Sequence, residues 1–320
     1  MTDLTSRATP CLWTVNRPGI SSPVSKIETA FAPAAPAAPA ASTGVDLDAY
    51  FTRIGYDGPR EATLEVLRAI HQKHPDAIPF ENIDVLLDKP ISLEPADIDA
   101  KLIGAGRGGY CYEQNGLLKR VLTALGFEVT GLMARVLWMV PADAPARPRS
   151  HMVLGVRVPG DDTVWLADVG FGGCVLTAPL RLFSDEVQAT PNGDFRILPI
   201  AALGGERQVQ ANLSGKWAAT YQVALGPWAD QDYEQANFYT YTHPSSHFTW
   251  SLTAGRTTPT ARYAMKNNRL THRDATGALV EQRDLSADEL EAVLRDVIGL
   301  PVEPEWRPLL EKIVGWGTPS

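Results

Sequence analysis

Three residues of this chain have the types that catalysis by an activated thiol requires, and they occur in the order Cys111, His151, Asp168. A thiolate is the reactive form of cysteine, a histidine can take its proton, and a carboxylate can hold that histidine in one tautomer. An isolated cysteine is more often a small apolar core residue, so its surroundings in the sequence have to decide.

Cys111 is predicted to lie at or just inside the first turn of a buried helix. It follows a glycine-rich stretch, residues 104–109, that a helix would not tolerate well. Apolar residues then recur at helical spacing from Leu117 to Leu125, and Gly126 has the position of a left-handed C-terminal cap. Free backbone N–H groups and the positive end of the helix dipole favour a thiolate at such a position.

His151 and Asp168 fall on two strand-like runs, residues 151–158 and 163–169, that a Pro-Gly-Asp-Asp turn joins. A two- or four-residue turn there pairs Asp168 with Val153 and places it diagonal to His151 on the same face, whereas a three-residue turn would separate them. The hairpin therefore predicts a His151–Asp168 pair, and a purely structural hydrogen bond is the alternative interpretation.

The composition of the 320 residues is that of a globular protein with a sizeable core, since 44% of them are hydrophobic. The formal net charge of −8 argues against nucleic acid or an anionic membrane surface as the main partner. No apolar run approaches the ~18 residues that a membrane span needs, and the N-terminus lacks the pattern of a signal peptide.

Cysteine and histidine spacing indicates neither disulfides nor a metal site. The three cysteines, Cys11, Cys111 and Cys174, are odd in number and widely spaced, which fits a protein of the reducing cytoplasm. His71 and His74 lie three residues apart on a predicted helix, with no further Cys or His nearby. We therefore expect them to be solvated at the end of that helix, and we expect no metal.

The order of predicted elements is helices, then strands, then a mixed end. Helical spacing predicts a helix from Leu47 behind the N-cap Asp46, one from about Thr63 and one between Pro95 and Ile103. Besides the hairpin, strands are predicted at residues 129–140, 195–200, 208–213, 217–225, 249–252, 262–265 and 270–272. A capping box of Ser286 and Glu289 then predicts a helix over 286–298.

Four segments of the chain resemble the arylamine N-acetyltransferase family. They are the Arg-Gly-Gly-Tyr-Cys-Tyr-Glu-Gln-Asn run at 107–115, Ile-Pro-Phe-Glu-Asn at 78–82, Ser-His-Met at 150–152 and Asp-Val-Gly-Phe-Gly-Gly at 168–173. Their order and spacing also suit the family. The resemblance runs from about Leu47 to the C-terminal helix, and four ordered motifs make a chance match very improbable.

The resemblance implies an enzyme that transfers an acetyl group from acetyl-CoA to an arylamine, arylhydrazine or N-hydroxyarylamine through a thioester, in a ping-pong scheme. By motif match Cys111 is the nucleophile, His151 the base and Asp168 the residue that orients it. It also implies an acceptor site and a CoA site, made by Phe80, Phe171 and Phe248 and by Tyr239 and Ser245, respectively. Core packing is the alternative for the three aromatic rings, most of all for Phe80.

The expected fold is α+β with several domains and a Cys-His-Asp arrangement like that of cysteine proteases. We expect a helical bundle at residues 45–128, a β-barrel-like domain at 129–232 and an α/β lid at 233–320. Residues 1–44, which include an Ala/Pro repeat, are predicted to be a disordered extension, with a tag or sequence upstream of the true domain start as alternatives. The site would then lie between domains, as pockets often do.

Several alternatives stay open at this point. Arg147 and Arg149 could offer cations to CoA phosphates or be exposed loop charges without a partner. An amide synthase of the same superfamily, which closes an aryl-amine polyketide into a macrolactam, would keep the triad. The same triad in a cysteine hydrolase would pass the acyl group to water. A binding protein with a vestigial site would keep the fold alone, but the intact motifs argue against it.

Overall fold

The computed structural model describes residues 44–316, apart from residue 142, residues 201–204 and residue 227. The predicted extension at residues 1–44 lies outside the described residues, except for Gly44. Cys11 lies outside them too. Within the described part, no helix has the length and apolar character needed to span a bilayer.

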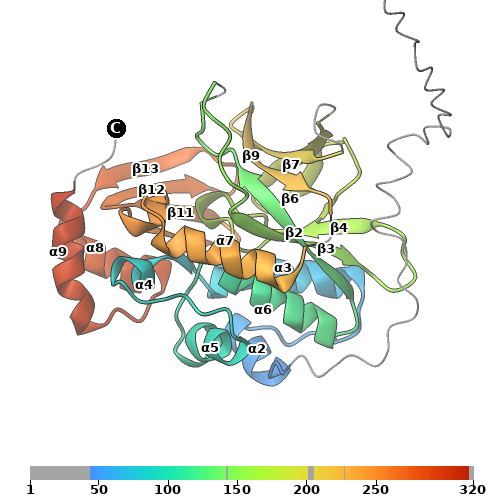
Figure 1. The fold of residues 1–320 in the computed structure, drawn as a ribbon, viewed down its shortest axis with the longest axis horizontal. Helices are drawn as coiled ribbons and strands as arrows, with labels where there is room; N and C mark the ends of the chain where they lie inside the picture. Colours follow the sequence, from blue (N-terminus) through green and yellow to red (C-terminus); the bar gives the residue numbers. More distant parts are fainter. Residues whose placement is uncertain (1–43, 142, 201–204, 227, 317–320) are drawn as a thin grey trace, which may run out of the picture.

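The first half of the described chain is helical. Figure 1 shows α3 and α6 beneath the strands, with α2 and α5 below them. The helices are α2 (Leu47–Ile54), α3 (Leu64–Ala77), α4 (Ile83–Leu86), α5 (Pro95–Asp99) with a π-helical turn η1 (Ala100–Gly104), and α6 (Cys111–Ala124). Asp46 and Thr63 cap α2 and α3 through their side chains, so the predicted starts of both helices are confirmed.

An eight-stranded, barrel-like antiparallel sheet follows, in the order β5-β4-β3-β2-β9-β8-β7-β6. Its strands are β2 (Glu128–Val136), β3 (His151–Arg157), β4 (Val164–Ala167), β5 (Leu180–Arg181), β6 (Gln188–Thr190), β7 (Gly193–Pro199), β8 (Arg207–Leu213) and β9 (Lys216–Ala224). Along β3 the side chains alternate between two cores. Met152 and Leu154 belong to the core shared with α6, and Val153 belongs to the core inside the sheet. Both faces of β3 are thus buried.

A five-stranded antiparallel sheet and further helices form the C-terminal part, with α8 and α9 at one end of the sheet (Figure 1). The strand order is β1-β10-β11-β12-β13, so β1 from the helical part is its edge. The strands are β1 (Phe80–Glu81), β10 (Thr253–Thr257), β11 (Ala261–Lys266), β12 (Arg269–Asp274) and β13 (Leu279–Asp284). The helices are α7 (Asp230–Thr242), α8 (Ala287–Val293) with π-helical η5 (Leu294–Ile298), and α9 (Arg307–Gly315), and the short 3₁₀ turns are η2 (Gly172–Cys174), η4 (His247–Thr249) and η6 (Pro304–Trp306).

The observed architecture confirms the expected α+β fold with a helical part, a barrel-like sheet and an α/β end. The domain boundaries at residues 128 and 232 remain a prediction. The strand predicted at 249–252 is wrong, because η4 and a turn occupy it and β10 starts at Thr253. The run predicted at 129–140 ends at Val136, and Met139 has a positive φ of 55° that an extended strand excludes.

The helix α7 was not predicted from the sequence. Its buried face is made by Tyr233, Asn237 and Thr240, which are spaced like a helical stripe but are polar or only partly apolar. Hydrophobic periodicity therefore gives no indication of this helix.

Candidate active site

Cys111 is the first residue of α6, as the glycine-rich approach and the apolar repeat predicted. Its side chain is buried, with 3% of its surface exposed, and its Sγ lies 3.7 Å from the carbonyl oxygen of Ser150. The thiol therefore faces the start of β3 from the N-terminal end of a helix.

The hairpin of β3 and β4 has the register that brings His151 and Asp168 together. Leu154 lies opposite Ala167, which is the pairing that a turn centred on Gly160 and Asp161 requires. His151 Nε2 lies 2.8 Å from Asp168 Oδ2, and both side chains are buried. The predicted contact of the two residues is thus present in the structure.

The electrostatics of the pair favour an imidazolium. Burial alone lowers the pKa of His151, but the Asp168 carboxylate and the Cys111 thiol raise it to about 10. Burial likewise raises the pKa of Asp168, yet His151, Asn115 and other donors hold it below its usual value. Because Asp168 holds Nε2 of His151, the other ring nitrogen is the one available to the thiol. We refer to Cys111, His151 and Asp168 as the triad, and their catalytic roles stay a prediction.

Asn115, one turn after Cys111, joins α6 to the residues around Asp168. Its Nδ2 donates to Asp168 Oδ1 at 2.9 Å and to the carbonyl of Met152 at 2.8 Å, and its Oδ1 accepts the N–H of Val169 at 3.0 Å. The sequence places Asn115 in the nucleophile motif, but its spacing alone gave it no role.

The segment after Asp168 is packed without free space between two parts of the molecule. A Cβ on Gly170 would lie 2.7 Å from Cys111 Cα, and a Cβ on Gly173 would lie 2.5 Å from Ala264 Cβ of β11. Only glycine permits this approach at either position. The segment therefore contacts α6 at one end and the C-terminal sheet at the other.

Aromatic rings surround the imidazole. The ring of Phe171 lies 5.2 Å from that of His151, and Tyr221 of β9 lies 5.0 Å from both. Tyr221 was missed from the sequence, because a tyrosine in a strand is ordinarily core. Nothing in its spacing connects it with His151.

The two other predicted acceptor residues lie against each other. Phe80 and Phe248 have ring centroids 6.0 Å apart, and Phe248 lies 5.8 Å from Tyr110, the residue before Cys111. Phe80 is 7% exposed, so core packing accounts for much of its environment. The acceptor role of both rings stays a prediction.

The residues predicted to contact CoA lie at the end of α7 and in the turn after it. The ring of Tyr239 stacks on His243 at 4.4 Å, and the N–H of Ser245 donates to His243 Nδ1 at 3.1 Å. Arg149 has a partner, since its Nη2 lies 2.6 Å from Glu206 Oε1, so the interpretation as an unpaired charge is wrong for it. Arg147 is exposed.

His71 and His74 are fully buried, so the prediction that they are solvated is wrong. His74 lies 2.8 Å from the hydroxyl of Tyr50 and 2.7 Å from Gln114 Oε1, and His71 Nε2 accepts the N–H of Asp168 at 3.0 Å. Both histidines continue the helical stripe of Leu67 and Ile70, which is the pattern that could have identified them. Among the described residues no group of Cys, His, Asp or Glu is arranged as a metal site.

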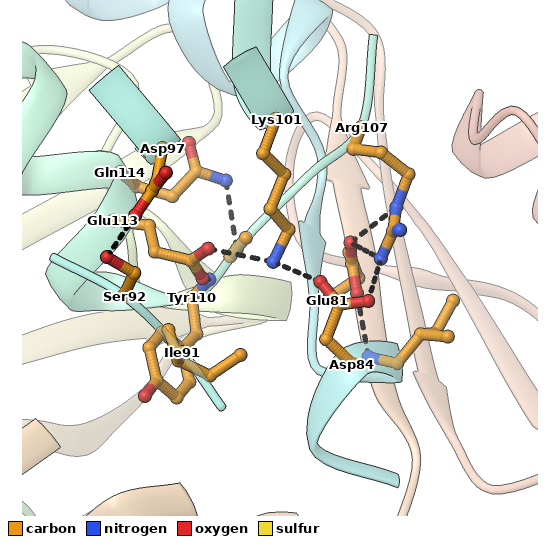
Figure 2. A network of polar contacts seen from close by, with 12 residues as sticks. Glu81, Asp84, Ile91, Ser92, Asp97, Lys101, Arg107, Tyr110, Glu113 and Gln114 are labelled. Atoms are coloured by element: carbon orange, nitrogen blue, oxygen red, sulfur yellow. Dashed lines mark hydrogen bonds and ion pairs between the residues drawn. The ribbon is translucent and has the colours of Figure 1, made fainter. Parts of the chain in front are cut away.

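A second buried polar group lies beside the start of α6 (Figure 2), and we name it the charge cluster: Glu81, Asp84, Lys101, Arg107 and Glu113. Lys101 Nζ lies 2.7 Å from Glu113 Oε1 and 2.8 Å from Asp84 Oδ2. Arg107 Nη2 lies 2.7 Å from Glu81 Oε1 and 3.1 Å from Asp84 Oδ1. Burial opposes the ionisation of Asp84, but the two cations hold its pKa below the usual value.

The charge cluster fixes the start of α6. Glu113 Oε2 accepts the N–H of Tyr110 at 3.0 Å and so caps the helix that carries Cys111. Gly109 precedes this cap, and a Cβ on Gly109 would lie 2.7 Å from the same carboxylate oxygen. The glycines of the nucleophile motif thus serve close packing, and a buried carboxylate positions the cysteine.

Most of the chain is similar in sequence and fold to proteins of one family. The family model described as N-acetyltransferase matches residues 63–307. The chain is 41% identical to the arylamine N-acetyltransferase of Escherichia coli (strain K12) over 259 residues, which cover 80% of this chain and 89% of that protein. It is 43% identical to that of Mycolicibacterium smegmatis over 253 residues, 78% of this chain and 90% of that protein. The structure of Mycobacterium marinum arylamine N-acetyltransferase in complex with CoA superposes with a TM-score of 0.78 at 36% identity, over 84% of this chain and 98% of that one.

Proposed function

The chain belongs to the arylamine N-acetyltransferase family, and we propose that it carries the acetyl group from acetyl-CoA to its acceptor on the sulfur of Cys111. It is an acetyltransferase that acts on the nitrogen of arylamines. The observation that carries the mechanism is the position of His151, which lies between the Asp168 carboxylate and the thiol and favours the charged form.

The first half-reaction makes an acetyl-enzyme. The Cys111 thiolate attacks the carbonyl carbon of acetyl-CoA, a new carbon–sulfur bond forms, and the bond to the CoA sulfur breaks. The His151 imidazolium gives its proton to the departing CoA thiolate, so CoA leaves as the thiol. His151 is then neutral, and Asp168 holds its tautomer.

The second half-reaction discharges the enzyme. The nitrogen of the arylamine attacks the thioester carbon, and neutral His151 accepts a proton from that nitrogen. The carbon–sulfur bond breaks, the acetylated arylamine leaves, and the thiolate–imidazolium pair is restored. No atom or proton is left unassigned over the two steps.

Residues outside the triad are proposed to bind the acceptor and CoA. Phe171 beside His151 and the Phe80–Phe248 pair beside Tyr110 would line the acceptor site, which would also take arylhydrazines and N-hydroxyarylamines. Tyr239 and Ser245, together with the exposed Arg147, would contact CoA. A cytoplasmic location suits a reaction that needs a reduced thiol, and modification of foreign arylamines is the role we propose.

The test is to mix the protein with acetyl-CoA in the absence of any acceptor. We expect intact mass to rise by one acetyl group and peptide mapping to place it on Cys111. Cys174 is not expected to react, because burial raises the pKa of its thiol. Adding an arylamine should remove the label, and initial-rate plots should be parallel.

Two variants and one measurement complete this test. Cys111→Ala should lose both label and turnover, whereas Cys174→Ala should keep most of its activity. Release of free CoA thiol with and without an arylamine separates acetyl transfer from hydrolysis. Intersecting rate plots without an acetyl-enzyme would mean direct transfer in a ternary complex and would overturn the proposal.

A further inference from the structure

His71 contacts the triad from a helix to which the mechanism assigns no role. It lies on α3, has no exposed surface, and its Nε2 accepts the main-chain N–H of Asp168 at 3.0 Å. A buried imidazole requires specific partners, so this contact at the one carboxylate that orients His151 calls for an explanation.

The backbone around Asp168 is held by side chains where strand pairing stops. The strand β4 ends at Ala167, and the next three main-chain N–H groups donate to side chains. Those of Asp168, Val169 and Gly170 donate to His71 Nε2, Asn115 Oδ1 and Asp168 Oδ1, at 3.0, 3.0 and 2.9 Å. The backbone at Asp168 and Val169 is therefore held by side chains of α3 and α6 rather than by strand pairing.

The hydrogen bond fixes the form of His71. Because Nε2 accepts, the ring proton of the neutral form lies on Nδ1, which is buried without a hydrogen-bond partner among the described residues. The titratable groups that act on His71 are Asp168 and, one turn along α3, His74. Burial outweighs Asp168 and lowers the pKa of His71 to about 4, so the ring is a neutral acceptor at neutral pH.

We propose that His71 is a positioning residue of this reaction, which fixes Asp168 against His151 by accepting its main-chain N–H and thereby keeps the Cys111–His151 pair charged. The expected effect on the rate of Cys111 acetylation rests on the proposed function. An acidic side chain at this position would place a second negative charge beside Asp168, and a leucine would leave the N–H without an acceptor. Glutamine has the length to put an amide oxygen near the position of Nε2, with no group that titrates.

Two variants at one position separate positioning from packing. His71→Leu keeps an apolar volume but removes the acceptor, and we expect the rate constant of Cys111 acetylation in a single turnover to fall about 10²-fold, as for a misplacement of about 1 Å. The KM for acetyl-CoA should change little, because no substrate contact is lost. His71→Gln should recover most of the rate. His74→Gln, on the same helix and equally buried, should lower the melting temperature with a much smaller effect on this rate.

A second readout does not depend on activity. In wild type, NMR titration of the His151 ring should show the imidazolium persisting to about pH 10. In His71→Leu the midpoint should move toward the ~6.5 of an ordinary histidine, and in His71→Gln it should stay near the wild-type value. An unchanged midpoint in folded His71→Leu, or a loss of rate that glutamine does not recover, would overturn the inference. Failure of wild type to form acetyl-Cys111 would instead overturn the proposed function.

Discussion

The charge cluster and the triad both hold buried ionised groups against α6, but they balance those charges differently. The cluster sets two cations, Lys101 and Arg107, among three carboxylates that share them. The triad region has one carboxylate, Asp168, whose remaining partners in the structure are neutral donors such as Asn115. In the cluster, cations and carboxylates neutralise one another, and their role is structural. The other partners of Asp168 are neutral, so its negative charge stabilises the His151 imidazolium.

The two regions also differ in what a lost charge would do. In the cluster, burial raises the pKa of Glu113 in spite of Lys101, so burial opposes the ionised form there more than its cation favours it. In the triad, His151 and Asp168 each favour the charged form although burial opposes it. Changes in the cluster should therefore appear in the free energy of unfolding, and changes in the triad should appear in the rate.

The strongest test of this contrast is Asp168→Asn. The substitution keeps the size of the side chain but removes the charge that supports the imidazolium, and it favours the wrong tautomer. We expect kcat to fall by about 10⁴, as for the same change in a serine triad. Asp84→Asn is the matched control in the charge cluster, and steady-state assays should show a far smaller loss there. Near-normal turnover of Asp168→Asn would mean that the carboxylate does not orient His151.

Arg107→Met should reverse the pattern. It leaves Glu81 buried without its cation, which costs about 3–5 kcal/mol of the free energy of unfolding. Urea titration measures this, and turnover per folded molecule should change by only a few-fold. Arg283→Met is the control, because Arg283 pairs at the surface with Glu281 and Glu289, and such exposed pairs contribute about 1 kcal/mol or less. Equal losses of unfolding free energy in Arg107→Met and Arg283→Met would mean that the buried cluster stabilises the fold no more than a surface pair does.

Gly170→Ala tests the packing of the segment after β4 against α6. The added Cβ would lie 2.7 Å from Cys111 Cα, so α6 or the segment after β4 has to move. A displacement of about 1 Å should lower kcat about 10²-fold. Gly116→Ala, inside α6, would meet only Ile98 Cδ1 at 3.7 Å and should raise helix stability without loss of rate. Full activity of Gly170→Ala would show that the contact is not needed.

The last test concerns acid, and its effect per pH unit is small. Burial lowers the pKa of His71 to about 4 and of His74 to about 3, so between pH 6.5 and 4 the unfolded chain binds protons that the folded chain does not. The free energy of unfolding should then fall as pH falls, by up to about 1.4 kcal/mol per pH unit for each histidine. His151 has a raised pKa, so its contribution is complete below pH 6.5 and is lost toward pH 10. Urea titrations over this acid range measure the slope, and a slope that His74→Gln does not reduce would contradict the assignment.

Local patterns in the sequence predicted the parts of the site that depend on one element or one hairpin. The apolar repeat placed Cys111 at a helix start, and turn parity placed Asp168 beside His151, because both follow from fixed repeats of the backbone. The charge cluster could not be predicted in this way. Its five members come from β1, α4, η1, the loop before α6, and α6. Each charged residue alone suggests a solvent-exposed position.

The burial of polar residues also could not be predicted from the sequence. His71 and His74 lie on the apolar stripe of α3, but without further Cys or His residues nearby in the sequence they are expected to be solvated at the helix end. The helix α7 buries Tyr233, Asn237 and Thr240, so its inner face has no apolar period. In both cases the partners that make burial possible, such as Gln114 for His74, belong to other elements.

The tight packing at Gly170 and Gly173 also connects the site at the start of α6 to β11, a part of the chain that is synthesised late. Cys111 is synthesised long before Ala264, whose Cβ meets the segment at Gly173. Until the C-terminal sheet has formed, the segment lacks its contact with β11 at Gly173 and is held only at the end where Gly170 packs on α6. A chain still on the ribosome, or one cut before β11, should therefore be acylated at Cys111 more slowly than the complete chain. Rapid acylation of Cys111 would then report that synthesis and docking are complete, and a growing chain would be spared most premature acylation.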